Sequence, residues 1–244
     1  MNIHGPSLGI GVAITVAAIF GAYFALNNVN QEKPLVIEKT PEIEQNTEPE
    51  IEQNTEPQKL KKEVFTANAS SYLGDENAPI TMVEFGDYQC FFCNKYFHET
   101  EHEILKNYVE TGKVKILFKD FTIIGPDSIN AAHAAHCANE EGKFWEYHDI
   151  LYNNWTGENN GWASSENLFK FAKEIGLNTD NFSECMLEAR YQDMIIASNN
   201  DAKSLGLDGT PGFFVIGPDN EVTRIGGAQP YDVFKRAFDS ELNK

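Results

Sequence analysis

The chain has 244 residues, of which 41% are hydrophobic, including 17 Phe and 9 Tyr. That is enough for one domain of ordinary size with a real core, plus an appendage. The formal net charge of −18 at pH 7 argues against a nucleic-acid-binding protein and against docking on anionic lipid headgroups, because both need clustered Lys and Arg.

Residues 8–26 form an apolar run without a charged side chain. As a helix rising about 1.5 Å per residue, this run reaches roughly 28 Å, close to the thickness of the bilayer core. We therefore expect residues 1–26 to form an uncleaved signal anchor with a transmembrane helix. A cleaved signal peptide is the alternative, although the flank lacks Lys and Arg and no convincing small-x-small site follows the run.

Residues 27–64 are rich in Pro, Glu, Gln, Asn and Thr, and the octapeptide PEIEQNTE occurs at 41–48 and again at 49–56. Such a composition buries too little apolar surface to offset chain entropy. We expect a disordered acidic linker that holds a folded domain, residues 65–244, away from the membrane.

The folded domain shows alternating strand and helix patterns. In chain order we predict a strand at 80–85, a helix at 90–109, a strand at 113–119, helices at 128–139, 143–152, 165–175 and 181–205, strands at 213–216 and 221–225, and a helix at 230–242. This order predicts an α/β fold of the thioredoxin-like type, with a helical domain inserted at about residues 126–205.

Two cysteines, Cys90 and Cys93, enclose Phe91 and Phe92 at the start of the predicted helix 90–109. The N-terminal end of a helix favours a thiolate, so Cys90 is the expected nucleophile and Cys93, one turn later, the resolving thiol. The alternatives are a buried disulfide that never turns over and a pair of zinc ligands. Zinc usually takes four ligands, and no second CxxC is present, so we predict no metal site.

Three segments resemble the DsbA-type thiol–disulfide oxidoreductases, in the membrane-anchored or secreted prokaryotic branch. These segments are LGDENAPITMVEFGDYQCFFC, AAHCANEEGKFWEYHDILY and GTPGFFVIG. The resemblance implies an extracytoplasmic enzyme without a bound cofactor, in keeping with disulfide chemistry in an oxidising compartment. It also implies exported client proteins with free thiols and a membrane partner linked to quinone, similar to DsbB or VKOR.

The segment Gly209-Thr210-Pro211 resembles the cis-proline loop of that family, which packs against the dithiol. The free backbone groups before the proline would pair with an extended client. An ordinary trans turn before a strand is the alternative.

Glu84 interrupts a strand that should be buried on both faces, and in many relatives an acid at this place lies beneath the dithiol. We expect Glu84 to relay a proton to and from Cys93. The alternative is a strand-end Glu that reaches solvent. Lys119, at the end of the next predicted strand, would either pair with Glu84 or lie on the surface.

Phe91 and Phe92 replace the more usual Pro or His of the family, and neither carries a charge. We therefore expect Cys90 to be less acidic than the strongest oxidants of the family, and the two rings to offer clients an apolar platform. Cysteines often occur in this branch at the places of Cys137 and Cys185, which implies a structural disulfide. Two free thiols, or a metal site that includes His133, are the alternatives.

The direction of electron flow stays open at this stage. Introduction of disulfides is the predicted activity, an isomerase or reductase of the same fold is an alternative, and a non-catalytic, metal-carrying thiol binding module is a second one.

Overall fold

The computed structural model describes residues 62–244, so the predicted anchor at 1–26 and most of the predicted linker at 27–64 lie outside the described residues. Among the residues that it does describe, no helix has the length and apolar composition of a membrane span. The first element is a short helix, α1 (Lys62–Thr66), which begins inside the predicted linker. Its Phe65 ring lies 5.0 Å from the Phe214 ring, and this contact ties α1 to the domain.

A sheet of four strands in the order β2-β1-β3-β4 forms the centre of the described domain. Its strands are β1 (Ile80–Gly86), β2 (Val114–Asp120), β3 (Gly212–Ile216) and β4 (Val222–Gly226). β1 is parallel to β2 and antiparallel to β3, and β3 is antiparallel to β4. All the predicted strands are confirmed, with boundaries that differ by one residue.

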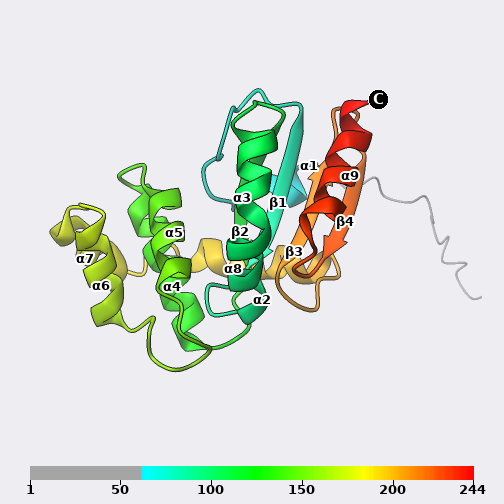
Figure 1. The fold of residues 1–244 in the computed structure, drawn as a ribbon. Helices are drawn as coiled ribbons and strands as arrows, with labels where there is room; N and C mark the ends of the chain where they lie inside the picture. The colour runs from blue at the N-terminus through cyan, green and yellow to red at the C-terminus, as the bar shows by residue number, and fades with distance from the viewer. Residues whose placement is uncertain (1–61) are drawn as a thin grey trace, which may run out of the picture. The chain divides into compact units, whose positions relative to one another are not determined.

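Alternate side chains of β1 point to opposite faces of the sheet. Ile80 and Met82 pack with the helical segment after β1 and with α9 (Tyr231–Leu242), whereas Val83 and Phe85 pack with α1 and α8 (Gln192–Ser204). Figure 1 shows these helices around the sheet. β1 and β2 are fully buried, as continuous apolar strands between two helical layers should be.

The helix after β1 occupies residues 91–109, but it is not a regular α-helix throughout. It consists of α2 (Phe91–Tyr96), a π-helical segment η1 (Phe97–Glu101), a short α3 (His102–Ile104) and a second π-helical segment η2 (Leu105–Val109). The apolar pattern of the sequence does not distinguish π from α winding, so the predicted single α-helix is correct in extent and wrong in regularity. π-helical turns occur frequently at functional sites.

The helical insertion contains α4 (Pro126–Asn139), α5 (Phe144–Asn153), α6 (Ser165–Glu174), α7 (Thr179–Leu187) and α8. The predicted single helix over 181–205 is wrong, because α7 ends before Ala189, which adopts a φ of 50°. The Tyr191 N–H after this break donates to His133 Nε2 over 3.1 Å. The break between α7 and α8 is therefore stabilised by His133 on α4, and no Gly or Pro in the sequence predicts it.

Candidate active site

A turn after β1 delivers Cys90 to the start of α2. The buried carboxylate of Asp87 accepts hydrogen bonds from the backbone N–H groups of Gln89, Ile123 and Ile124, at 2.9, 2.8 and 3.0 Å. The Asp87 carbonyl accepts the Cys90 N–H at 3.0 Å. Asp87 thus ties the turn to the segment that follows β2, and Cys90 becomes the N-cap residue of α2.

The two thiols of this turn are both buried, but their pKa values shift in opposite directions. Cys90 retains an exposed fraction of 5%, whereas Cys93 is completely buried. The pKa of the Cys90 thiol falls to about 6, mainly because the Cys93 thiol donates a hydrogen bond to it, with help from the Cys93 and Phe92 N–H groups against the opposing effect of burial. This agrees with a moderately acidic thiol. Burial, followed by the contact with Cys90, raises the pKa of Cys93 well above its usual value.

The structure brings the Thr210-Pro211 loop against Cys90. The peptide bond between these two residues is cis, and the Cys90 Sγ lies 3.4 Å from the Thr210 carbonyl oxygen. Thr210 and Pro211 are buried and Gly209 is half-buried. The Pro211 carbonyl accepts the Gly227 N–H at 2.8 Å, so the end of β4 holds the loop in place.

Glu84 lies on the face of β1 that the helix at 91–109 covers, and its exposed fraction is 2%. The alternative of a strand-end Glu in solvent is therefore wrong. Burial raises the pKa of Glu84 well above its usual value, and the charges of Glu101 and Cys90 raise it further. Glu84 is thus a buried acid near the dithiol whose protonated form is favoured by its surroundings.

Sequence reasoning missed Glu101, the last residue of η1, which is 3% exposed. Burial, followed by the charge of Asp149, raises its pKa to about 8. Nearby, the hydroxyls of Tyr88, Tyr96 and Tyr152 are buried and have no hydrogen-bond partner among the described residues. Glu101 lies in the polar stretch 98–103, so no local feature of the sequence marked it as buried.

Lys119 neither pairs with Glu84 nor lies on the surface, so both expectations for it are wrong. It pairs in register with Phe85, whereas Glu84 pairs with Phe118, so Lys119 and Glu84 lie on opposite faces of the sheet. The Lys119 ammonium is buried, lies 2.7 Å from an Asp201 carboxylate oxygen and donates to the Ala67 carbonyl at 2.5 Å. Lys119 is therefore a structural residue that joins β2 to α8 and to the segment after α1.

The rings of Phe91 and Phe92 are half exposed, at 50% and 55%, with centroids 5.3 Å apart. The ring of Trp155 lies 6.0 Å from Phe91. An apolar surface therefore borders Cys90, as the sequence predicts.

The loop after α5, residues 154–161, also borders the dithiol, and sequence reasoning did not single it out. Trp155 Nε1 donates to the Gln89 carbonyl at 2.8 Å, and the Asn159 N–H donates to the Gln89 side chain at 2.8 Å. Glu158 accepts the Phe91 N–H at 3.0 Å. This loop therefore contacts the residues on both sides of Cys90.

Cys137 on α4 and Cys185 on α7 form a disulfide with a Cα–Cα distance of 5.8 Å, the pairing that the family resemblance implies. His133 accepts the Tyr191 N–H and is not joined to either sulfur. The two alternatives for these cysteines are therefore wrong, and the free thiols of residues 62–244 are Cys90 and Cys93.

Comparison with known proteins gives a consistent result. A thioredoxin family model matches residues 66–239. Disulfide bond formation protein D of Bacillus subtilis is 25% identical over 173 residues, which cover 70% of this chain and 76% of the relative. The crystal structure of oxidised BdbD from Bacillus subtilis has a TM-score of 0.65 and 25% identity, over 72% of this chain and 94% of that one.

A second solved structure, the α-DsbA1 protein of Wolbachia pipientis, has a TM-score of 0.64 and 24% identity, over 71% of this chain and 90% of that one. At this level of identity the likeness supports the fold alone.

Proposed function

The chain belongs to the thioredoxin family as a DsbA-type thiol–disulfide oxidoreductase, and from this premise we propose that it introduces disulfides into exported proteins. The observation that carries the proposal is the unequal pair of thiols. A thiol with a pKa of about 6 is a good leaving group and a stable thiolate, so the reduced form is favoured and the disulfide is readily given away.

In the forward direction, a client thiolate attacks Cys90 Sγ of the Cys90–Cys93 disulfide. The S–S bond breaks, a mixed disulfide joins the client to Cys90, and the electron pair leaves on Cys93. A second client thiolate then attacks the client sulfur of the mixed disulfide. The client leaves with its own disulfide, and Cys90 is left as a thiolate beside the Cys93 thiol.

Cys93 needs a proton when it leaves, because its burial makes a thiolate there costly. We propose that Glu84 supplies this proton and takes it back when the dithiol is reoxidised. Its raised pKa, caused first by burial, supports this role, as does its place on the covered face of β1. A general acid of this kind acts through a pKa matched to its task.

The client would extend along the Gly209-Thr210-Pro211 loop, whose backbone lies against Cys90. The Thr210 carbonyl is directed at the sulfur, so a strand-like client segment placed there brings its own cysteine to Cys90. Phe91 and Phe92 provide exposed apolar surface beside this position, which suits unfolded clients.

The domain would work outside the cytoplasm, held to the membrane through residues 1–26 and the acidic linker. Reoxidation of the dithiol would then fall to a quinone-linked membrane protein similar to DsbB or VKOR. The apolar run at 8–26 supports the anchor, and the family supports the oxidising compartment.

The deciding experiment is the reduction potential of Cys90–Cys93, measured by equilibration with glutathione. A value of about −120 to −180 mV would support disulfide donation. A value of about −250 mV or below would mean that the dithiol prefers to be oxidised, and would make the protein a reductase.

A further inference from the structure

Glu158 is an acidic residue next to the Cys90 turn that has no part in the proposed mechanism. Glu158 Oε1 accepts the backbone N–H of Phe91 at 3.0 Å. Phe91 is the residue directly after Cys90 and the first residue of α2. The N–H groups of a first helical turn have no partner inside the helix, so they are the donors on which a thiolate at the N-cap depends.

One of these donors is already bonded to Glu158. The N–H groups of Phe92 and Cys93 make no capping hydrogen bond to the Cys90 side chain, although both help to lower the pKa of its thiol. The N–H of Phe91 is directed to Glu158 instead. Glu158 therefore takes one donor of the turn and adds a negative charge close to the position where the Cys90 thiolate forms.

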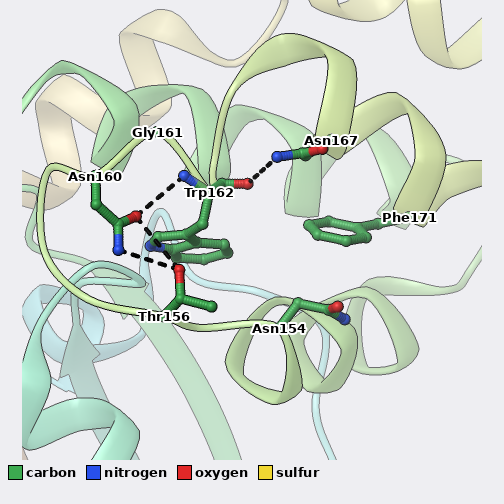
Figure 2. A pocket seen from close by; sticks show the side chains of 7 residues that line it. All are labelled: Asn154, Thr156, Asn160, Gly161, Trp162, Asn167 and Phe171. Carbon is green, nitrogen blue, oxygen red and sulfur yellow. Dashed lines mark hydrogen bonds between the residues drawn. The ribbon is translucent and has the colours of Figure 1, made fainter.

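Glu158 is exposed, yet its loop is held in place from both ends. Gln89, which precedes Cys90, accepts hydrogen bonds from Trp155 Nε1 and from the Asn159 N–H, each at 2.8 Å. Within the loop, the Asn160 side chain bonds to Thr156 and accepts the Trp162 N–H at 3.2 Å (Figure 2). The loop is thus anchored beside Cys90, and the hydrogen bond from the Phe91 N–H places the Glu158 carboxylate there.

No cation balances this charge among the described residues, because none of the ion pairs within residues 62–244 includes Glu158. Phe91 and Phe92, the two residues between the cysteines, are also uncharged. A carboxylate near an ionising thiol disfavours the thiolate.

We propose that Glu158 is a positioning residue that destabilises the Cys90 thiolate and so makes the Cys90–Cys93 disulfide a milder disulfide donor. The inference rests on the proposed function, since it assigns Glu158 to setting the strength of that donor. The reduced form contains the thiolate, so a group that opposes the thiolate shifts the redox equilibrium toward the disulfide.

The test is Glu158→Gln, which removes the charge and keeps an oxygen to accept the Phe91 N–H. We measure the pH at which alkylation of Cys90 by iodoacetamide is half-maximal, and the redox equilibrium with glutathione at pH 7. The midpoint should fall by about a third to two thirds of a pH unit, the size expected for an exposed charge. The redox equilibrium should shift about two- to fivefold toward the dithiol, which is roughly 9–21 mV.

Two further variants separate charge from loop structure. Glu158→Ala removes the charge and the acceptor, and should lower the midpoint as the Gln variant does. Glu174→Gln removes one charge from the exposed end of α6 and should leave the midpoint unchanged. An unchanged or higher midpoint in Glu158→Gln, or an equal fall in Glu174→Gln, would overturn the proposal.

The alkylation assay reads the Cys90 thiol and not its turnover. If the wild-type protein failed to donate disulfides, the proposed function would fall while the midpoints still judged Glu158. If the wild type donated disulfides but the alkylation midpoints of the wild type and Glu158→Gln were equal, only the role of Glu158 would be refuted.

Discussion

The Cys90 Sγ and the Thr210 carbonyl oxygen are 3.4 Å apart, although 120 residues separate them in the chain. The sheet explains this contact. β1 and β3 are antiparallel, and Phe85 near the end of β1 lies opposite Gly212 at the start of β3. The chain that leaves β1 and the chain that enters β3 therefore meet at one edge, where the dithiol faces the loop proposed to seat clients.

Removal of the Cys93 thiol should make Cys90 less acidic. The hydrogen bond from Cys93 is the largest cause of the lowered pKa of about 6, so Cys93→Ala should move the alkylation midpoint of Cys90 upward by about one pH unit or more. Cys93→Ser retains a donor at the same position and serves as the matched control, with a smaller shift. An alanine variant with the wild-type midpoint would contradict this assignment.

Glu84→Gln should slow the steps in which Cys93 leaves or attacks. Glutamine keeps the size of the side chain but cannot transfer the proton, and general acid–base groups contribute roughly a hundredfold or more. We expect a loss of about this size in client oxidation measured by stopped flow, together with loss of the corresponding limb of the pH–rate profile. An unchanged profile would exclude the relay.

Glu101→Gln should stabilise the reduced protein at neutral and alkaline pH. The pKa of Glu101 is about 8 in the folded protein, raised first by burial and then by Asp149, whereas an unfolded Glu has a pKa of about 4.3. The stability that the protonated acid contributes is therefore fully present below about pH 4 and is lost as pH rises toward about 8.

The glutamine variant does not titrate, so its free energy of unfolding should exceed that of the wild type by about 1–3 kcal/mol at pH 8 and match it near pH 4. Urea denaturation at both pH values measures the difference. Glu110→Gln, an exposed acid after the same helix, is the control and should show no such trend. A Glu101→Gln advantage that is equal at the two pH values would refute the titration of this carboxyl.

Loss of the second disulfide should weaken the fold without changing the chemistry of the dithiol. The Cys137–Cys185 bond closes a separation of 48 residues, so Cys137→Ala/Cys185→Ala should lower the free energy of unfolding by about 3–4 kcal/mol. The Cys90–Cys93 reduction potential should stay within a few mV of the wild type. A large change in this potential would show that the Cys137–Cys185 disulfide is coupled to the Cys90–Cys93 pair.

Particular residues show where sequence reasoning is sufficient and where it fails. The strands are recognisable because β-branched and aromatic residues form short runs, and Cys90, Cys93 and Pro211 because their spacing and order are specific. The break between α7 and α8 has no such local signal. It depends on Ala189, in a left-handed conformation, and on the bond from the Tyr191 N–H to His133 on another helix.

Lys119 gives the same lesson for charge. Its sequence neighbours suggested a surface position or a pair with Glu84, whereas the register of β1 and β2 places it on the other face with Asp201. One residue of register reverses the face that a side chain occupies, and register is set by pairing between strands.

The sequence by itself determined the dithiol, its place at a helix start and the α/β class, because these depend on residues that are neighbours in the chain. Tertiary structure alone decided that Glu101 is buried and that Glu158 bonds to the residue after Cys90. Glu158 stands 68 residues from Cys90 in the sequence. Burial and electric fields arise from whatever the fold brings close, and those distances are set by packing and not by sequence separation.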